Sequence, residues 1–449
     1  MLEQKIQGRK ANITIIGLGY VGLPLALGFA RKGFKVFGLD DDSPKIEKLL
    51  SGQDYINGQN EVVRQLVQSG HFQPTRNSEV ISQSDVVVIC VPTPLTRNRE
   101  PDISYVEQVS RRIGQLIQVG SLVVLESTTY PGTTEEVVLP AILAGNRVTR
   151  VGQDFHLAFS PERVDPGNPS YDSYNTTKVV GGVTPACTHL TTLLYQALLD
   201  HPDLVKEASS SRAAEMEKLF ENIFRSVNIA LVNELALLCR EMNLDAWEIL
   251  DLASTKPFGF MRFNPGPGIG GHCIPLDPFY LTWKAREFDF PTRFIELAGE
   301  LNSRMPFHVV DLVAEGLGSR GLEDARVLLL GMAYKKDVAD HRESPSLKVY
   351  DLLLKRGARV DYFDPLIPQI KTADGMLRSV AAGSFQDYDC LVLMTDHSQF
   401  DLSKLVRACK VFVDTRGVVR ELNQDFGDTR VLGLGLPARR TGPRLQVVH

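Results

Sequence analysis

Short apolar runs in the first part of the chain predict buried strands that alternate with helices. The run 12–16 is rich in β-branched residues, a glycine-marked turn follows it, and the apolar segment 23–32 predicts a helix that Gly33 ends. The run 35–40 predicts the second strand of this unit. Further strands are predicted at 85–91, 122–126 and 155–159. Strands that alternate with helices are typical of a parallel α/β sheet.

The last third of the chain repeats this layout. A strand is predicted at 325–331, followed by a polar loop, a helix and a second strand at 359–364. Two more apolar runs, 391–394 and 411–414, predict additional strands. The pattern therefore predicts an α/β protein with two Rossmann-like, doubly wound domains.

Between these regions, residues 209–242 are predicted to form one long helix. Apolar side chains cover most of its circumference, and one face carries a polar stripe of Glu215, Lys218, Asn222 and Arg225. A solvated face with ion pairs inside the helix is one interpretation of this stripe. The apolar remainder favours another, in which the helix is buried nearly all round and the stripe meets a substrate or a second subunit. Helices are also expected at 279–304 and 303–321.

Length and charge indicate how many domains to expect and which partners to exclude. With 449 residues the chain is too long for a single core, so two or three domains are expected. The net charge of −5 and the lack of a long basic run argue against a nucleic-acid partner. The apolar stretch 13–30 is interrupted by Gly17, Gly19, Gly22 and Pro24, so neither a signal peptide nor a membrane partner is expected.

The six cysteines are scattered, with no CxxC motif and no Cys/His ligand spacing. This pattern is typical of free thiols in a reducing compartment and predicts no metal site. A cytoplasmic location is therefore expected.

The turn after the first strand, from Gly17 to Gly22, carries the spacing GxGxxG, and Asp40 ends the next strand. Glycines let a helix N-terminus approach a pyrophosphate, whose charge is stabilised by free N–H groups and the positive end of the helix dipole. The acid, about 20 residues on, accepts hydrogen bonds from a ribose diol and repels a 2′-phosphate. These residues predict NAD rather than NADP as the cofactor. A glycine turn needed only for packing is the alternative.

Polar residues follow the later strands, at the edge where parallel sheets bind ligands. Thr93 and Thr128 are candidate cofactor or substrate contacts, and a loop or cap hydroxyl is an equally good interpretation of either one. Glu162 and Arg163 follow the strand 155–159 and are charged residues that a surface loop would also carry.

The loop 265–278 is rich in glycine and proline and carries Cys273, with His272 beside it and Asp277 four residues on. Glycine brings backbone close to a ligand, and proline fixes the path of the loop. A thiol with little side-chain bulk around it can reach a substrate carbon. A buried small hydrophobe is the more ordinary role of a free cysteine.

The loop 332–345 of the second α/β region lacks the GxGxxG spacing and carries Lys335, Lys336 and Arg342 before a predicted helix. Cations at a helix N-terminus favour an anion such as a nucleotide diphosphate. The tail 437–449, rich in Arg and Pro, is expected to be loose.

From about residue 11 to 432 the chain resembles the nucleotide-sugar dehydrogenases, the family of UDP-glucose and GDP-mannose 6-dehydrogenases. The specific stretches are GLGYVGLPLA, VPTP, ESTTYPGTT, SPERVDPGN, EMEKLFENIFRSVNIALVNE, GPGIGGHCIPLDP, GMAYKKDVADHRESP and DTRG. The resemblance implies an NAD-binding domain over 1–205, a central helical domain with the cysteine loop over 206–321 and a UDP-binding domain over 322–449. It also implies that the long helix forms the core of a homodimer or higher homo-oligomer.

By resemblance, Cys273 is the nucleophile of an oxidation that takes a primary alcohol to a carboxylate and removes two hydrides. Lys218 and Asn222 would stabilise the oxyanions. Asp277 would orient the base or water of the first oxidation.

The resemblance also implies that Glu162 activates water for hydrolysis and that Thr128 helps to hold it. Positions matching NAD contacts are Gly17, Gly19, Val21, Gly22, Asp40, Lys45, Thr93, Thr128 and Arg342. Positions matching substrate contacts are Glu162, Arg163, Lys218, Asn222, Phe258, Gly266, Gly268, Gly270, Gly271, Lys335 and Arg416. UDP-glucose enzymes have an acid where this chain has Pro166 and a lysine where it has Leu276, so those contacts are not carried over. Arg163 is a candidate for part of the missing role.

Within the family the chain is most similar to the branch that acts on UDP-N-acetylhexosamines. Arg163 beside Glu162 and the loop 258–266 carry this similarity, although Arg262 stands where a small residue or proline is usual. The expected activity is oxidation of UDP-N-acetylglucosamine at C6 to the uronate, for polysaccharide or O-antigen precursors. UDP-N-acetylmannosamine, UDP-N-acetylgalactosamine and UDP-glucose are alternative substrates.

Two alternatives come from other classes of protein. A two-electron dehydrogenase of the 3-hydroxyacid type shares the NAD domain and helical core but would not need Cys273. A non-catalytic NAD-binding protein would be expected to lose Lys218, Cys273 or Asp277, and all three are present.

Overall fold

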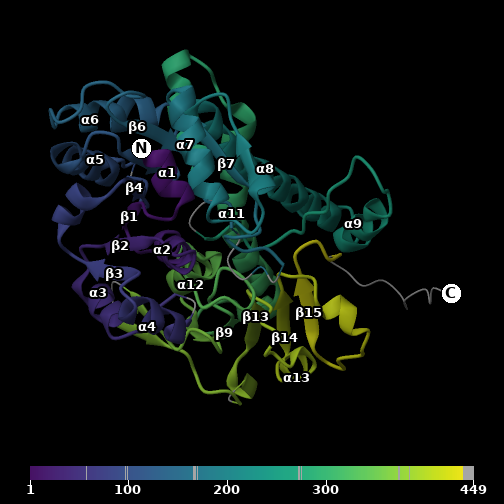
Figure 1. Ribbon diagram of the computed structural model, residues 1–449. Helices are drawn as coiled ribbons and strands as arrows, with labels where there is room; N and C mark the ends of the chain where they lie inside the picture. The colour runs from purple at the N-terminus through teal and green to yellow at the C-terminus, as the bar shows by residue number, and fades with distance from the viewer. Residues whose placement is uncertain are drawn as a thin grey trace. The chain divides into compact units, whose positions relative to one another are not determined.

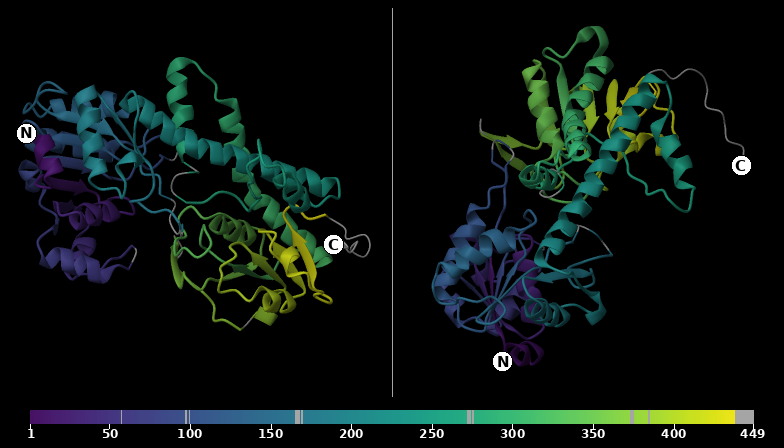
Figure 2. Two further views of the ribbon diagram at one scale, coloured as in Figure 1. Left: turned by 45° about the vertical axis from the view of Figure 1, so that its right-hand side comes forward. Right: turned by 90° about the horizontal axis from the view of Figure 1, so that it is seen from above.

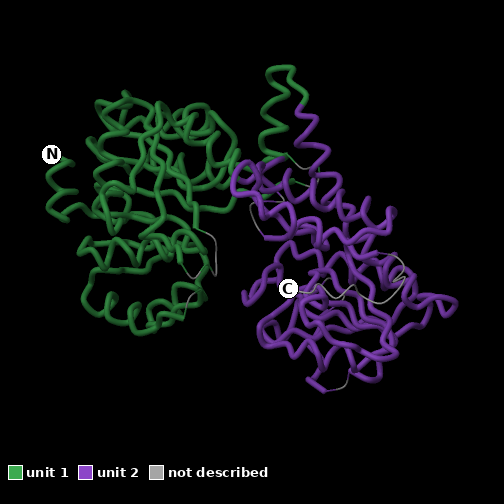
Figure 3. Tube along the Cα trace, turned by 90° about the vertical axis from the view of Figure 1, so that its right-hand side faces the viewer, with its two compact units in different colours: residues 1–221, 279–291 green, residues 222–278, 292–449 purple. Residues whose placement is uncertain are grey.

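The computed structural model describes residues 1–437 except positions 57, 97, 99, 165–167, 169, 272, 273, 275, 373, 374 and 384. Cys273, the predicted nucleophile, and Pro166 therefore lie outside the described residues. The chain forms two compact units (Figure 3). The first is built from Met1–Glu221 and Phe279–Pro291, and the second from Asn222–Pro278 and Thr292–His449.

The described part of the first unit contains an eight-stranded sheet with the order β3-β2-β1-β4-β5-β6-β7-β8 (Figure 1). Its strands are β1 (Asn12–Ile16), β2 (Lys35–Leu39), β3 (Phe72–Thr75), β4 (Val86–Ile89), β5 (Leu122–Leu125), β6 (His156–Phe159), β7 (Lys178–Gly182) and β8 (Val205–Glu207). Neighbouring strands are parallel except β6 and β7. The strand order reverses between β1 and β4, which is where doubly wound sheets bind dinucleotides.

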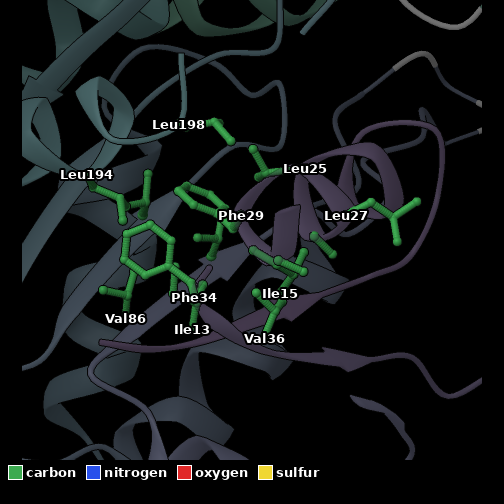
Figure 4. Packing of buried hydrophobic residues seen from close by; sticks show 14 of the residues in the cluster. Ile13, Ile15, Leu25, Leu27, Phe29, Phe34, Val36, Val86, Leu194 and Leu198 are labelled. Carbon is green, nitrogen blue, oxygen red and sulfur yellow. The ribbon is translucent and has the colours of Figure 1, made fainter. Parts of the chain in front are cut away.

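Both faces of this sheet are buried, which explains its continuous apolar runs. On one face Ile13, Ile15 and Val36 pack with Phe29 of α2 (Figure 4), and on the other Val87 and its neighbours form a second cluster. The helices are α1 (Leu2–Gln7), α2 (Gly22–Arg31), α3 (Ser43–Leu50), α4 (Asn60–Gln68), α5 (Ser104–Leu116), α6 (Leu139–Leu143) and α7 (Pro185–Gln196), with short turns η1 (Ser78–Gln83), η2 (Thr134–Val138), η3 (Pro202–Leu204) and η4 (Arg286–Phe288).

The described part of the second unit contains a five-stranded parallel sheet with the order β10-β9-β13-β14-β15. Its strands are β9 (Arg326–Leu330), β10 (Arg359–Phe363), β13 (Cys390–Leu393), β14 (Val411–Asp414) and β15 (Arg430–Gly433), and β11 (Gln369–Thr372) and β12 (Gly375–Arg378) form a separate hairpin. Its helices are α9 (Ala246–Ser254), α11 (Arg293–Leu317), α12 (Pro345–Lys355) and α13 (Leu402–Arg407), with turns η5 (Gly318–Arg320), η6 (Phe385–Asp387) and η7 (Val419–Leu422). Two Rossmann-like sheets are therefore confirmed.

The long helix α8 (Ser211–Glu241) is continuous (Figure 2) and confirms the prediction for 209–242. Its residues up to Glu221 belong to the first unit and the rest to the second. The expected burial nearly all round is wrong for the single chain, because Phe220 is 64% and Leu231 is 62% exposed. Among the described residues α8 is the one helix long and apolar enough to cross a membrane, and 44% of its most apolar window is buried within the protein. A core helix gives the same result.

The helices after the cysteine loop differ from the prediction. The helix α10 (Asp277–Ala285) stops well before Arg304, and α11 begins only at Arg293, so the helix predicted over 279–304 is broken. Asp289 between them has a φ of 52°, and Pro291 follows it. A left-handed residue and a proline both interrupt an α-helix. The boundary predicted near 303 is wrong as well, since α11 continues through Pro306.

Candidate active site

The three glycines of the turn between β1 and α2 have different surroundings. Gly17 has a φ of 90°, and a Cβ there would lie 2.5 Å from the carbonyl oxygen of Cys90. A Cβ on Gly22 would lie 1.9 Å from the carbonyl oxygen of Gly17. A Cβ on Gly19, in contrast, would meet no atom within 4 Å. Packing alone therefore explains Gly17 and Gly22 but not Gly19, whose open side fits the approach of a pyrophosphate.

Asp40 follows β2 and is held beside this turn. Its Oδ2 accepts the N–H of Leu18 at 2.8 Å, and Lys45 Nζ lies 3.3 Å from the same oxygen. Oδ1 accepts the N–H of Asp42 at 3.0 Å. The carboxylate side chain remains 11% exposed, so an oriented acceptor faces outward at the end of β2. This arrangement suits a ribose diol, and the glycine turn suits the adjoining phosphates, so the first unit fits NAD.

Hydrogen bonds join the loops that follow β4 and β5. The Thr93 hydroxyl donates to the carbonyl of Thr128 at 2.7 Å, and the hydroxyl of Tyr280 on α10 donates to the carbonyl of Thr93. Thr93 therefore has the structural role that its sequence position also allowed, and the two candidate threonines lie side by side.

The polar stripe of α8 is buried at three of its four positions. Glu215, Lys218 and Asn222 are 0%, 7% and 6% exposed, whereas Arg225 is exposed. Asn222 Nδ2 donates to Asp277 Oδ2 at 2.5 Å, and Asp277 is 2% exposed. A solvated face with internal ion pairs is therefore excluded for these three residues. Buried polar groups of this kind need partners from the protein or from a ligand.

Glu215 ties the loop after β5 to α8. Its carboxylate accepts the N–H of Gly132 at 2.6 Å, the N–H of Thr134 at 2.8 Å and the Thr134 hydroxyl at 2.7 Å. Burial raises the pKa of Glu215 to about 7, although the three hydrogen bonds oppose the shift. The loop that carries Thr128 is thus anchored one helical turn from Lys218.

Glu162 lies after β6 in a cluster of buried charges. Its Oε1 accepts the N–H groups of Arg163 at 2.8 Å and Val164 at 2.9 Å, and its Oε2 lies 3.4 Å from Lys178 Nζ. Burial favours the neutral acid, but Lys178, these two N–H groups and Lys218 outweigh it and lower the pKa of Glu162. Glu162 is therefore an ionised, oriented carboxylate and not a residue of an ordinary surface loop.

Arg163 is committed to partners within the first unit. Its Nε donates to Glu221 at 3.1 Å, its Nη1 donates to the Thr177 carbonyl at 2.9 Å, and Glu217 lies 3.6 Å from Nη2. Burial and the neighbouring carboxyl of Glu221 raise the pKa of Glu217 to about 7. A substrate contact through Arg163 would have to share this guanidinium with Glu221.

The glycine-rich loop packs closely on its own unit. Gly266 N–H donates to Asn233 Oδ1 at 2.9 Å, and a Cβ on Gly266 would lie 3.4 Å from Arg416 Nη1. A Cβ on Gly270 would lie 2.7 Å from the Cβ of Tyr334. Gly268 and Gly271 have φ values of 128° and 88°, which only glycine adopts without strain. The described part of this loop, Arg416 and the 332–345 loop therefore meet within the second unit.

The other predicted substrate and cofactor contacts of the second unit are either exposed or bonded to residues of the same unit. Arg416 Nε donates to the Met394 carbonyl at 2.7 Å, and Arg342 forms a two-pronged ion pair with Asp340 through bonds of 2.9 and 2.7 Å. Lys335 is partly buried. Phe258 is 71% exposed.

Comparison with known proteins decides the family. Family models for the NAD binding domain, the central domain and the UDP binding domain of the UDP-glucose/GDP-mannose dehydrogenase family match residues 11–199, 212–304 and 328–421. The chain belongs to this family.

Two relatives and one solved structure cover almost the whole dehydrogenase. It is 36% identical over 421 residues to a UDP-N-acetyl-D-mannosamine dehydrogenase of Pyrococcus horikoshii, covering 91% of this chain and 96% of the relative. It is 34% identical over 433 residues to a UDP-N-acetyl-D-glucosamine 6-dehydrogenase of Pseudomonas aeruginosa, covering 94% and 99%. The structure of a UDP-D-ManNAc dehydrogenase from Pyrococcus horikoshii matches with a TM-score of 0.85 at 31% identity, covering 94% of this chain and 99% of that one.

These findings confirm several expectations from the sequence. The protein is an NAD-dependent nucleotide-sugar dehydrogenase with a UDP-binding domain. The roles of individual residues and the domain boundaries at 205 and 321 stay predictions. Among the described residues no group of three His, Cys, Asp or Glu side chains could hold a metal ion.

The sequence interpretation missed Lys178, Glu126 and Glu215 as neighbours of the site. Lys178 begins β7, a strand that the pattern did not predict, and no motif links it to Glu162. Glu126 ends a predicted strand and begins the ESTTYPGTT stretch, and neither pattern indicates that it contacts Lys178. Glu215 was seen in the α8 stripe, but its partners in the β5 loop come from far along the chain.

Proposed function

We propose that this dehydrogenase oxidises the C6 hydroxymethyl group of a UDP-N-acetylhexosamine to the carboxylate, and that UDP-N-acetylglucosamine is its substrate. The buried polar stripe of α8 supports this type of reaction. Lys218 is a buried cation, and Asn222 is hydrogen-bonded to Asp277, which stands four residues after Cys273 in the sequence. A two-electron dehydrogenase of the 3-hydroxyacid type would not need Cys273.

The thiol explains how two oxidations occur on one substrate. C6 first loses a hydride and the hydroxyl proton, and Asp277 orients the base or water that takes this proton. The Cys273 thiolate adds to the aldehyde carbon, and loss of a second hydride converts the thiohemiacetal to a thioester. Water then cleaves the C–S bond and releases the carboxylate and the thiol. NAD, when bound, accepts one hydride in each oxidation.

The surrounding side chains supply charge and a base. The Lys218 cation favours the thiolate, and Lys218 and Asn222 donate to the oxyanions that form at C6. Glu162 takes a proton from the attacking water, and Thr128 helps to hold that water. The orientation of Glu162 by two backbone N–H groups supports this role.

The second unit supplies the contacts to the nucleotide and sugar. Lys335 and Arg416 provide cations for the diphosphate, and the glycine loop lets the backbone approach it. Arg342 is assigned to NAD. Phe258 provides an aromatic surface.

UDP-N-acetylmannosamine is the second candidate substrate, because the Pyrococcus horikoshii relative with 36% identity is named a UDP-N-acetyl-D-mannosamine dehydrogenase. The test is a comparison of kcat/KM for the three UDP-N-acetylhexosamines and UDP-glucose, together with the NADH formed per sugar at completion. We expect two NADH per sugar and a preference of about 100-fold for an N-acetyl sugar over UDP-glucose. One NADH with accumulating aldehyde would contradict the reaction, and equal use of UDP-glucose would contradict the substrate.

The proposed enzyme is a homodimer built on α8. Large apolar side chains that recur every four or seven residues remain exposed along this helix: Met216, Phe220, Phe224, Leu231 and Leu238. Such spacing forms one stripe, and a second copy of the chain would bury it. In analytical ultracentrifugation, Leu231→Glu should sediment as a monomer. Leu50 is exposed at the end of α3, and Leu50→Glu should still sediment as a dimer. A cytoplasmic location and a place in polysaccharide precursor synthesis also stay predictions.

A further inference from the structure

Glu162 belongs to a buried cluster whose other members have no part in the proposed reaction. Lys178, the first residue of β7, places Nζ 2.9 Å from Glu126 Oε2, 3.1 Å from the Pro161 carbonyl and 3.4 Å from Glu162 Oε2. The other oxygen of Glu126 accepts the hydroxyl of Tyr195 on α7. The side chains of Lys178 and Glu126 are 5% and 0% exposed.

The cluster holds one more carboxylate than a buried ion pair needs. A lysine buried with a single carboxylate is already neutralised, so a second carboxylate beside it costs free energy, and charged groups held at such a cost cluster at functional sites. Glu126 and Tyr195 hold Lys178 from one side, and Lys178 in turn reaches Glu162. With two backbone N–H groups on Oε1 and Lys178 on Oε2, the Glu162 carboxylate has a fixed orientation.

We propose that Lys178 is a positioning residue for Glu162 and that Glu126 and Tyr195 hold it in place. Lys178 orients the carboxylate and keeps it ionised, so that it can take a proton from the water that hydrolyses the thioester. This inference rests on the proposed function, because it needs Glu162 as the base of the hydrolysis step.

The electrostatics around Glu162 support this role. Burial alone would favour the neutral acid, and the attraction of Lys178 is the strongest opposing influence on the pKa of Glu162. The titratable or charged groups that interact with Glu162 are Cys90, Glu126, Arg163, Tyr174, Lys178 and Lys218. Arg163 is already paired with Glu221, so loss of Lys178 should leave burial dominant and raise the pKa of Glu162.

The test uses Lys178→Met in the full-length enzyme, with NAD and the best UDP-sugar of the panel. We expect the first turnover to release two NADH per site at nearly the wild-type rate, because both oxidations precede hydrolysis. Steady-state kcat at pH 7 should fall at least about tenfold, and the acidic limb of its pH profile should move to higher pH. Intact-mass spectrometry of the acid-quenched enzyme should detect the acyl group bound to the protein. Lys178→Arg, which keeps the charge, should restore the wild-type pH limb.

Lys284→Met is the matched control. Lys284 lies in the same unit, its side chain is 6% exposed, and its Nζ is 2.6 Å from Glu136 and 2.7 Å from Glu287. Its loss removes an equally buried lysine from two carboxylates but touches no member of the Glu162 cluster. The pH limb should stay at its wild-type position, and no acyl-enzyme should accumulate.

Comparison with Glu162→Gln separates the two levels of the proposal. Acyl-enzyme in Glu162→Gln but a wild-type pH limb and no acyl-enzyme in Lys178→Met would overturn the role of Lys178 and leave the proposed function standing. Wild-type hydrolysis by Glu162→Gln would overturn both. If Lys178→Met does not fold, Lys178→Gln, which keeps a polar side chain at this position, decides by the same measurements: a wild-type acidic limb and no acyl-enzyme would overturn the proposal.

Discussion

Each Rossmann-like region places a glycine of positive φ after its first strand and an aspartate after its second. In the first region these are Gly17, with a φ of 90°, and Asp40; in the second they are Gly331, with a φ of 88°, and Asp364. Both aspartates accept an N–H group from the glycine turn, at 2.8 Å and 2.7 Å. The two regions therefore share a local framework although only the first has GxGxxG.

The two aspartates differ in what remains for a ligand. The side chain of Asp40 is 11% exposed and accepts two backbone N–H groups. The side chain of Asp364 is fully buried and accepts the N–H groups of Met332, Ala333, Leu366 and Ile367 and the Nε2–H of His397. Asp364 thus holds its own loops together and has no oxygen left for a ribose.

The N-termini of α2 and α12 also differ in how much room they leave for a ligand. A Cβ on Gly19, before α2, would meet open space, whereas Gly268 and Gly270 pack on Pro345, the first residue of α12. In the first region the helix end is free to receive a phosphate, and in the second the chain covers it. We therefore expect side-chain cations such as Lys335 to meet the diphosphate of the proposed substrate. Gly19, and not the tightly packed Gly17 and Gly22, is therefore the part of the glycine spacing that the cofactor requires.

The largest effect is expected from Cys273→Ala, which removes the chemistry and leaves both nucleotide regions intact. Loss of the nucleophile removes the covalent path, so acid formation should fall by many orders of magnitude. Calorimetric titration should show unchanged affinities for NAD and UDP. Near-wild-type turnover would reduce Cys273 to a packing residue.

Exchanging the two aspartates for alanine should give opposite results. Asp40→Ala should raise KM for NAD about tenfold or more and improve use of NADP, with little change in thermal stability, because it removes a ligand acceptor and a repulsive charge. Asp364→Ala should lower the free energy of unfolding by about 3 kcal/mol, because it leaves buried N–H groups unpaired. KM for NAD, measured on the folded fraction, should not change. An altered KM in Asp364→Ala would contradict the division of roles.

The glycines allow the same comparison with a smaller effect. Gly19→Ala should fold normally, since its Cβ has room, and should weaken NAD binding about tenfold by blocking the pyrophosphate. Gly331→Ala should cost about 1–3 kcal/mol of stability, because alanine is strained at a φ of 88° and its Cβ would lie 2.6 Å from Thr395. Melting curves and NAD titrations of both variants check this. A destabilised Gly19→Ala would mean that the turn is needed for packing after all.

The sequence predicts those parts of the fold that local pattern determines. β1, β2, β9 and β10 are visible because short runs rich in apolar residues identify them. The pattern does not predict β7 or β15, since Lys178–Gly182 contains two glycines and Arg430–Gly433 has only two apolar residues between its ends. The helix break near Asp289 was missed because nothing in the apolar spacing reveals a left-handed residue.

The candidate site divides in the same way. The family motifs identify Glu162, Lys218, Asn222 and Asp277, because these residues lie in recognisable stretches. The support around them is not visible, since Lys178 and Glu126 reach Glu162 only through the folding of three strands onto one sheet. Covered and open helix ends also cannot be distinguished before the loops are placed.

The smallest expected difference between the two units is in how Glu215 and Asp364 make stability depend on pH. Burial raises the pKa of Glu215 in the first unit from 4.5 to about 7, so between these values the folded chain binds a proton that the unfolded chain has released. Its contribution to stability is therefore complete below pH 4.5 and is lost as the pH rises through 7. In the second unit burial acts against the ionised form of Asp364, but His397 and backbone N–H groups outweigh it and lower the pKa below 3.8. That stability is present above pH 3.8 and is lost only as the pH falls.

Thermal unfolding of Glu215→Gln and Asp364→Asn from pH 5 to 8 separates these contributions. Glutamine cannot titrate, so the stability difference between wild type and Glu215→Gln should shrink by about 2 kcal/mol or less as the pH rises from 5 to 8. The difference between wild type and Asp364→Asn should stay constant over the same range, because Asp364 is ionised throughout. Glu61→Gln, on the surface of α4, should leave the wild-type curve unchanged. A constant difference for Glu215→Gln would show that its carboxylate is already ionised at pH 5, and hence that its three hydrogen bonds outweigh its burial.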